Sequence, residues 1–186
     1  MLTTNDADLA RRVRSLRNHG ASPAPTPIHP FDMGPFDHLG FNYRLSDIQA
    51  AVGIVQMSRL DHLLEERRAC AHRYGALLKA VPWIDPPQEA AGFYHTFQSY
   101  VVWIRSDAPR SRNDIMLELE RRGIQSRPGT LAVHLTNYYR DKYGYRPEDF
   151  PVSRRAQHET ITLPIFPGMT ASDQERVVDV LQACAG

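Results

Sequence analysis

Apolar residues recur with a helical period in several stretches of this chain. Leu9, Val13 and Leu16 stand three or four positions apart, which places them on one face of a helix. Asn5 can cap the start of that helix, and Gly20 is a suitable end. The pattern therefore predicts a first helix between Asn5 and Gly20.

The longest helical pattern begins at Ser46. Ser46 and Gln49 have the spacing of a capping box, and an apolar stripe continues from Ile48 to about Ala80. A helix of about 30 residues is long for a globular domain. We therefore expect residues 46–81 to form a connecting helix that bends or breaks once at most and packs along a second subunit or another domain.

Strand and helix patterns alternate after residue 94. The clearest strand is the β-branched and aromatic run TFQSYVVWI, and Thr170 with Asp173 forms a capping signature before the last helix. A helix at 111–122 is expected to bury Ile115, Leu117 and Leu119. The alternation predicts a small α+β domain with helices on one face of a short sheet. The expected elements are the tail of a strand at 1–4, strands at 96–104, 124–127 and 160–163, helices at 111–122, 135–142, 151–159 and from 170 on, and loops at 82–92 and 128–150.

The charge of the chain gives no general reason to expect nucleic acid or an acidic membrane as a partner. The 22 basic and 21 acidic residues leave a net charge of +1, and arginines are interleaved with acids, as in LEERR and ELERR. No apolar run reaches the roughly 18 residues that a membrane span needs. The N-terminus carries no apolar signal core. With Cys70 and Cys184 as the only cysteines, we expect two inert thiols in a reducing compartment and a cytoplasmic protein.

The sequence carries no motif for metal binding or for nucleophilic catalysis. The eight histidines include no i, i+4 pair, and there is no paired-cysteine spacing, Gly-rich phosphate loop or nucleophile elbow. We therefore expect no metal site. Lysine chemistry has two candidates, because Lys79 and Lys142 are the only lysines. The proline-rich stretch 21–39 predicts a loop, and a loop of this length is usually functional or disordered.

Asn42 and Arg44 stand just before the long helix, in GFNYRLSDIQAAVG. Two interpretations are open at this point. Asn42 can form a turn that leads into the helix, while Arg44 pairs with a carboxylate. Alternatively, the amide and the guanidinium bind an anion together with the first N–H groups of the helix.

Three stretches of the chain, in this order, resemble the DegT/DnrJ/StrS family of pyridoxal-phosphate-dependent aminotransferases. They are MLTTNDADLARRVRSLRNHG, GFNYRLSDIQAAVGIVQMSRLDHLLEERRACAHRYGALL and GIQSRPGTLAVHLTNYYRDKYGYRPEDFPVSRRAQHETITLPIFPGMT. The resemblance covers nearly the whole chain, and its stretch from Thr130 to Tyr145 is most similar to the perosamine-synthase-like branch. It implies the C-terminal part of an α/β enzyme of fold type I, the aspartate aminotransferase type. That part would hold the end of the large domain at 1–45, the long connecting helix at 46–81 and a small α+β domain at 82–186.

The resemblance also implies an activity and a missing part. Family members transfer an amino group, with glutamate as the expected donor, to a nucleotide-linked keto-sugar in amino-sugar and cell-surface polysaccharide biosynthesis. Their cofactor-binding lysine lies upstream of the counterpart of Met1, and neither Lys79 nor Lys142 matches its segment. We therefore expect an inactive isolated chain without a catalytic lysine. Pyridoxal phosphate would bind in a complete enzyme, formed as a homodimer or with the missing N-terminal half. The alternative is a non-catalytic dimerisation or interaction module that pairs through the long helix.

Five residues match the motifs of the family's binding sites. By resemblance, Asn42 contacts the cofactor phosphate of the neighbouring subunit, and Arg44 supports that loop or meets the substrate. His19 lines the active-site entrance or has a structural role. Arg127 and His134 fall where the family approaches the nucleotide-sugar, and arginine suits a diphosphate. The sequence around Arg127 differs in many relatives, so the sugar remains open.

Overall fold

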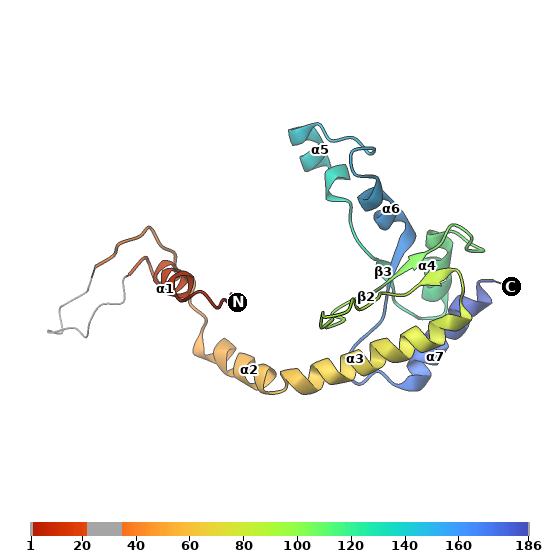
Figure 1. Cartoon of the computed structure of the whole chain (residues 1–186), viewed down its shortest axis with the longest axis horizontal. Helices are drawn as coiled ribbons and strands as arrows, with labels where there is room; N and C mark the ends of the chain where they lie inside the picture. The colour runs from red at the N-terminus through yellow and green to blue at the C-terminus, as the bar shows by residue number, and fades with distance from the viewer. Residues whose placement is uncertain (1, 22–34, 186) are drawn as a thin grey trace. The chain divides into compact units, whose positions relative to one another are not determined.

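The chain forms two compact units, residues 1–58 and 59–186, in a computed structural model that describes residues 2–21 and 35–185 (Figure 1). Most of the loop predicted at 21–39 lies outside the described residues. The strand tail predicted at 1–4 is wrong for residues 2–4, which have no strand beside them in the described part of their unit.

The first helix, α1 (Ala7–Leu16), is capped by Asp6 and not by Asn5. The Asp6 carboxylate accepts the N–H of Asp8 at 2.9 Å and the N–H of Leu9 at 3.0 Å. These are first-turn donors that have no partner inside the helix. Asn and Asp are about equally good N-cap residues, so residue type alone could not decide between Asn5 and Asp6.

The second helix, α2 (Asp47–Ser58), begins at the predicted capping box. The Gln49 N–H donates to Ser46 Oγ at 3.3 Å, and the Ser46 N–H donates to Gln49 Oε1 at 3.2 Å. No residue of α2 is buried, and its apolar side chains stand in the open, with Ile48 81% and Ile54 70% exposed. A helix that is apolar on all sides normally lies inside a larger protein or assembly.

The helical pattern resumes after Arg59, as α3 (Leu60–Leu77) and a 3₁₀ turn, η1 (Leu78–Ala80). The pattern predicted at 46–81 is therefore divided into two helices at Arg59. This helix, unlike α2, takes part in a core, because it buries Cys70, Ala71 and Tyr74.

Four antiparallel strands of the second unit form one sheet in the order β1-β2-β4-β3. Their bounds are Ile84–Asp85 for β1, Tyr100–Ile104 for β2, Arg127–Pro128 for β3 and Thr160–Leu163 for β4. The prediction of β4 is confirmed. In contrast, β1 lies inside a predicted loop, and both β2 and β3 begin later than expected. A two-residue strand carries no alternation that a pattern could reveal.

The core of the second unit lies on one face of this sheet. Alternation along β2 turns Tyr100, Val102 and Ile104 to that face, where all three are buried. The helices α3, α4 (Arg112–Arg121) and α7 (Ala171–Ala183) contribute the rest of the cluster. The predicted capping box of α7 is confirmed, since the Thr170 and Asp173 side chains each accept the other residue's backbone N–H.

The helix α6 (Pro151–Glu159) has the predicted bounds but lies against the opposite face of the sheet. Trp103, which points away from the core, donates from Nε1 to Glu159 Oε2 at 2.7 Å, and the Arg155 guanidinium lies 5.2 Å from its ring centre. The expectation of helices on one face only is therefore wrong.

The buried side of α4 is narrower than predicted. Ser111 caps this helix, and Ile115 and Leu119 are fully buried. Leu117 is 48% exposed, because it is two positions from both Ile115 and Leu119 and therefore points to the opposite side of the helix.

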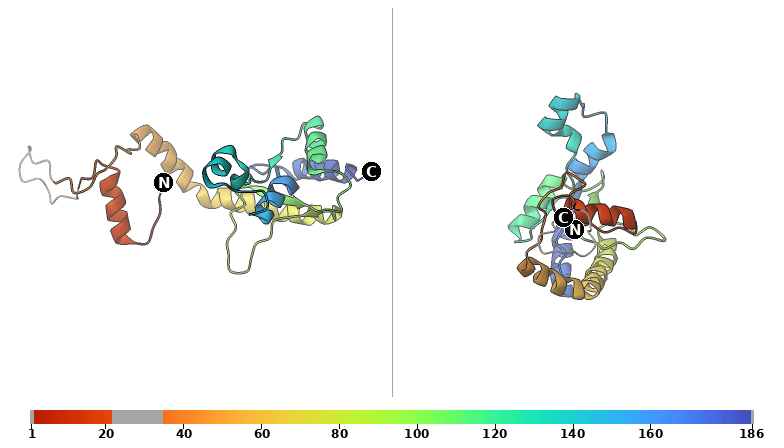
Figure 2. Two further views of the ribbon diagram at one scale, coloured as in Figure 1. Left: turned by 90° about the horizontal axis from the view of Figure 1, so that it is seen from above. Right: turned by 90° about the vertical axis from the view of Figure 1, so that its left-hand side faces the viewer.

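The loop at 86–99 projects from the second unit and is fastened to α3 by Arg68 (Figure 2). The Arg68 guanidinium donates to both carboxylate oxygens of Glu89, at 2.7 and 3.0 Å, and to the His95 carbonyl at 2.6 Å. It also lies 4.0 Å from the ring centre of Tyr94. The hydrogen bonds from Arg68 and from the His95 N–H lower the pKa of Glu89 to about 2.

Candidate functional site

In the first unit, the segment that carries Asn42 and Arg44 is paired with the end of α1. The Phe41 N–H donates to the Leu16 carbonyl at 2.6 Å, and the His19 N–H donates to the Phe41 carbonyl at 3.0 Å. Asn18 and Asn42 form an isolated antiparallel bridge. The structure therefore brings His19, Asn42 and Arg44 together, although more than twenty residues separate His19 from the other two.

Close backbone packing fixes this crossing. A Cβ atom on Gly40 would overlap the backbone of His19 and Gly20. His19 has a φ of 60°, which is uncommon for a residue with a side chain. Strain of this kind persists only where the surroundings hold the backbone in place. The His19 side chain is exposed at this point.

Arg44 is oriented by a side-chain amide and not by the carboxylate considered from the sequence. Its Nη2 and Nε donate to Asn18 Oδ1 at 2.6 and 3.2 Å. The exposed side chain of Asn42 makes no recorded hydrogen bond with the described residues. The Arg44 contact thus braces the segment, while the Asn42 amide remains available to a group outside the chain.

A cavity of about 810 Å³ lies beside Arg44, and its wall includes Arg14 and Arg17 of the α1 region. The three arginines line this cavity together with apolar residues such as Val13 and Leu45, and guanidinium groups favour an anion. Sequence reasoning missed Arg14 and Arg17. The signal was their spacing of three residues in RRVRSLR, which places both on one side of a helix.

In the second unit, Arg127 lies in the edge strand β3, on the sheet face opposite the core. It pairs with Thr162 of β4, and Thr162 pairs with Val101 of β2, so the three form a row across the sheet. Val101 alternates with the buried residues of β2, which identifies the face. The Arg127 side chain is exposed and lines a cavity of about 920 Å³ between α4 and residues 123–128.

The loop after Arg127 is held down at two points. The Gly129 N–H donates to the Thr160 carbonyl at 3.1 Å, and the Ala132 N–H donates to Gln157 Oε1 at 2.7 Å. The carbonyl of Gln157 in turn accepts Arg112 Nη2 at 3.0 Å. Gln157 therefore joins α4, α6 and this loop, a role that no local pattern indicates.

His134 lies in a 3₁₀ turn, η2 (Val133–Leu135), and is 6% exposed. Its Nε2 atom is buried and has no hydrogen-bond partner among the described residues. Its ring centre is 5.0 Å from that of Phe150. A buried polar atom without a partner costs about 1–3 kcal/mol. His134 does not line the cavity of Arg127.

The two lysines lie in open positions. Lys79 is exposed in η1, and Lys142 is exposed in the helix α5 (Asn137–Tyr143), where Nζ donates to the Tyr138 hydroxyl at 2.9 Å. Neither lines one of the cavities described above. Neither lysine has the buried surroundings in which a lysine amine usually becomes a reactive nucleophile.

Across residues 2–21 and 35–185, no helix is both long and apolar enough to cross a membrane. Within these ranges, no group of three or more His, Cys, Asp or Glu side chains is arranged to hold a metal ion. Cys70 and Cys184 are free and buried.

The chain is similar to several solved aminotransferases. It is 28% identical to a DegT/DnrJ/EryC1/StrS aminotransferase from Brucella abortus, with 98% of this chain and 45% of that chain covered and a TM-score of 0.78. It is 26% identical to DesV of S. venezuelae, solved with a ketimine intermediate, over 98% and 46% of the two chains, at a TM-score of 0.82.

A third similar structure shows the fold alone. It is a putative sugar aminotransferase of Streptococcus pneumoniae, whose PMP form is 19% identical over 98% of this chain and 46% of that chain, at a TM-score of 0.84. The same protein was also solved in its PLP form. This chain spans about half the length of the solved structures that it matches.

These matches confirm the predicted fold, the α/β fold of the fold-type-I aminotransferases. The family profile described as "DegT/DnrJ/EryC1/StrS aminotransferase family" matches residues 1–182. The chain therefore belongs to the DegT/DnrJ/EryC1/StrS family of aminotransferases.

Proposed function

We propose that this chain is the C-terminal part of a pyridoxal-phosphate-dependent aminotransferase that moves an amino group from glutamate to a nucleotide-linked keto-sugar. The observation that carries the proposal is the exposed Asn42 amide, which has no recorded partner in the described chain, in a family match over residues 1–182. The lysine that binds the cofactor would come from a segment not contained in these 186 residues.

The residues around Asn42 fit the phosphate of the cofactor. Asn42 would donate from its amide to a phosphate oxygen, and Arg44 would hold the segment in place through Asn18. Arg14 and Arg17 add positive charge beside Arg44. Once bound, pyridoxal phosphate supplies the electron sink for amino transfer. The residues of this chain would bind and orient the cofactor phosphate.

Substrate contacts are proposed for the second unit. Arg127, exposed on the sheet face opposite the core, would bind the diphosphate of the nucleotide-sugar through its forked donors. His134 would supply a donor or acceptor to the same substrate, and His19 would line the entrance of the site. The exposed apolar side chains of α2 support pairing with a second copy or with the missing half. We place the enzyme in the cytoplasm, on the basis of its two free, buried thiols.

Three preparations test this proposal. The chain alone is expected to show no transamination and no cofactor absorbance. Co-expression with the lysine-bearing half of a family member is expected to restore both, with nucleotide-linked keto-sugars as acceptors. An Asn42→Ala variant of the complex should lose cofactor affinity, while a variant at Asn5, which caps nothing, should not. Borohydride reduction that fixes the cofactor on Lys79 or Lys142 of the lone chain would refute the proposal.

A second candidate function rests on α2 alone. Its exposed apolar residues suit a non-catalytic module that pairs with itself or with a full-length relative. Stable assembly with the lysine-bearing half, without amination of any keto-sugar, would favour this module over the enzyme.

A further inference from the structure

Phe97, near the end of the loop 86–99, has a strained backbone. Its φ of 45° lies in the left-handed region, which residues with a side chain seldom adopt. Its side chain is 3% exposed and belongs to the core of the second unit, where its ring centre lies 6.3 Å from that of Tyr100. Strain of this kind persists only where the surroundings hold the residue in place. Contacts around Phe97 must therefore compensate for the strain.

The Phe97 N–H donates to a histidine two residues earlier in the chain. His95 Nδ1 accepts this N–H at 2.8 Å, and no other acceptor for it is recorded among the described residues. The two rings lie against each other, with centres 4.2 Å apart and planes inclined by 33°. An imidazole nitrogen accepts a hydrogen bond only when it carries no proton. His95 is therefore the neutral tautomer that has its proton on Nε2.

The backbone around His95 is fastened separately from its ring. The His95 carbonyl accepts Arg68 Nη1 at 2.6 Å, and the His95 N–H donates to Glu89 Oε1 at 2.7 Å. Further along the loop, Arg67 Nη1 donates to the Gln98 carbonyl at 2.9 Å. None of these bonds involves an atom of the imidazole. Of the hydrogen bonds recorded for His95 within the described chain, only that of Nδ1 therefore depends directly on the charge of the ring.

The charged and titratable groups near the His95 ring come from α3 and from the loop itself. They are Arg67, Arg68 and His72 of α3 and Glu89 and Tyr94 of the loop. The hydrogen bond from Arg68 is the largest cause that lowers the pKa of Glu89 to about 2, so this carboxylate stays charged between pH 5 and 8. Histidine is the side chain that changes its charge in this range. His95 and His72 are therefore the two groups that an experiment has to separate.

We propose that His95 is a pH-sensitive latch for the loop 86–99. In its neutral form, Nδ1 holds the Phe97 N–H and keeps the backbone of Phe97 in the left-handed conformation. When a proton binds, Nδ1 becomes a donor that faces the Phe97 N–H, so the hydrogen bond breaks and the two donors repel each other. Phe97 then loses a contact that compensates for its strain, and the turn at 95–97 relaxes.

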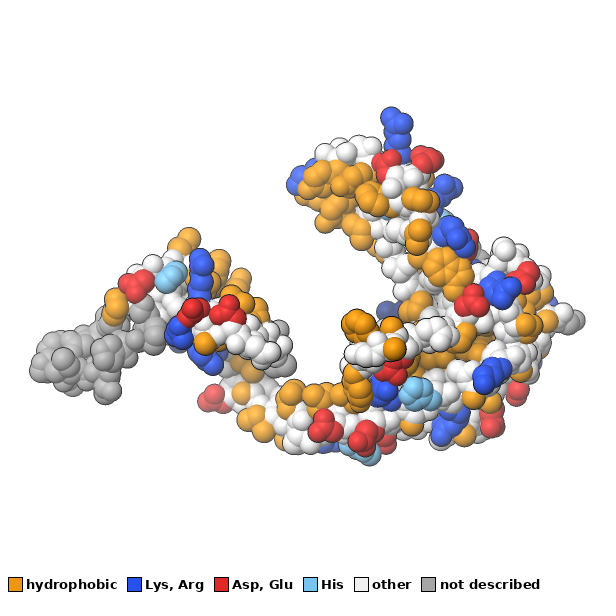
Figure 3. Space-filling view, in the orientation of Figure 1, with side chains coloured by type: hydrophobic (Ala, Val, Ile, Leu, Met, Phe, Trp, Pro, Cys, Tyr) orange, Lys and Arg blue, Asp and Glu red, His pale blue; other side chains and the backbone are white. Residues whose placement is uncertain are grey.

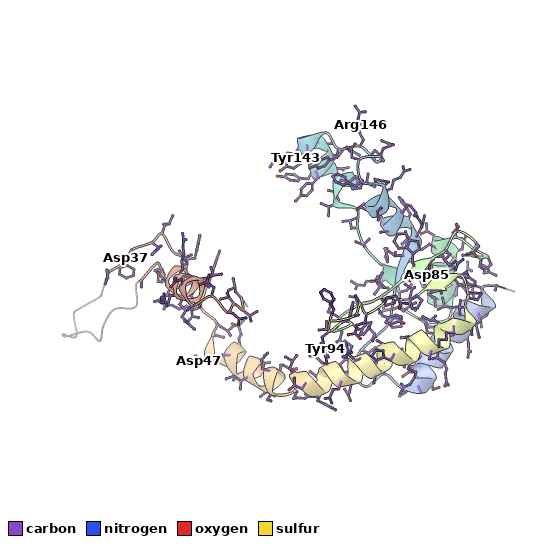
Figure 4. The ribbon with its side chains drawn as sticks, viewed as in Figure 1. Asp37, Asp47, Asp85, Tyr94, Tyr143 and Arg146 are labelled. Carbon is purple, nitrogen blue, oxygen red and sulfur yellow. The ribbon has the colours of Figure 1, made fainter. Side chains whose placement is uncertain are left out.

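The loop that this latch controls carries exposed aromatic rings at its free end. Phe93 is 76% exposed and Tyr94 is 61% exposed. Hydrophobic side chains gather at the free end of the loop in the space-filling view (Figure 3), and Tyr94 is labelled there in the stick view (Figure 4). Because Tyr94 directly precedes His95, relaxation of the turn changes how these rings are held. The latch thus makes the order of an exposed apolar surface depend on pH.

Hydrogen exchange of the full chain, followed by NMR at pH 5 and pH 8, tests the latch. The protection factor of the Phe97 amide, corrected for the intrinsic effect of pH on exchange, should be about tenfold lower at pH 5, as for the loss of one hydrogen bond. His95→Asn keeps an acceptor bonded to Cγ that takes up no proton in this range, so protection should be equal at both pH values. His95→Leu removes the acceptor and should give low protection at both. His72→Asn is the matched control and should keep the pH dependence of the parent chain.

Three results would overturn the latch. One is a Phe97 amide that is unprotected at pH 8 or equally protected at pH 5 and pH 8. Another is a pH dependence that disappears in His72→Asn but remains in His95→Asn. The third is a set of ¹⁵N shifts for the His95 ring at pH 8 that places the proton on Nδ1, because that tautomer cannot accept the Phe97 N–H. None of these measurements depends on amination, so the latch stands or falls separately from the proposed function.

Discussion

Among the described glycines of the second unit, Gly129 is the one at which an added methyl group would meet the closest neighbours. A Cβ atom there would lie 2.5 Å from Val101 Cγ1 and closer still to Thr160 Oγ1. Neither neighbour is a flexible chain end, because both are β-branched residues of paired strands. Overpacking of this kind typically costs about 1–3 kcal/mol. We therefore expect Gly129→Ala to reduce the free energy of unfolding of the second unit by that amount.

Gly75 provides the matched control in the same unit. It lies in α3, and a Cβ atom there would meet only the Tyr100 hydroxyl, at 3.9 Å. Gly75→Ala should stabilise the chain by about 1 kcal/mol, because alanine is the better helix former. Urea denaturation followed by the fluorescence of Trp83 and Trp103 measures both changes. Gly129→Ala with the stability of the parent chain would refute the close approach as the reason for glycine.

Three further changes test the Glu89 clamp, the Arg44 brace and the buried imidazole. The pKa of Glu89 is lowered to about 2 in the folded chain, so its contribution to stability is present above about pH 4.5 and is lost as the pH falls towards 2. The free energy of unfolding of Glu89→Gln should therefore depend less on pH in this range than that of the parent chain. Asn18→Ala should speed hydrogen exchange at residues 41–44, because Arg44 loses its acceptor. His134→Leu should leave the free energy of unfolding unchanged or raise it by up to about 3 kcal/mol, because it removes a buried polar atom that has no partner among the described residues.

Each of these expectations has an opposing result. An acid profile of Glu89→Gln identical to that of the parent chain would show that the Arg68 contact does not persist in solution. Unchanged exchange at 41–44 in Asn18→Ala, as in a control Asn5→Ala, would show that Arg44 does not brace this segment. A loss of more than 1 kcal/mol in His134→Leu would show that Nε2 has a partner after all.

Structural features that depend on residues close in sequence could be predicted from the sequence. The caps at Ser46 and Thr170 join residues three positions apart, and α6 begins at a proline, so neighbouring residue types suffice to place them. Contacts between distant segments were not readable. Asn18 meets Arg44 across 26 positions, and Ala132 meets Gln157 across 25, with no periodic pattern to connect them. The bounds of the two-residue strands β1 and β3 were not predicted for the same reason, because only their pairing with β2 and β4 defines them as strands.

The loops that carry Asn42 and Arg127 are both positioned by a glycine packed closely against another segment. In the first unit Gly40 lies directly on the backbone of Gly20, and in the second Gly129 lies directly on Thr160. Each loop follows a path that a side chain would block, and each presents an exposed polar residue, Asn42 or Arg127, close in sequence to that contact. Because glycine fixes the path, the exposed residues can change without moving the loop. Substitutions at Arg127 should therefore leave the fold of the second unit unchanged, whereas substitutions at Gly129 should alter whether the strand pairing forms at all.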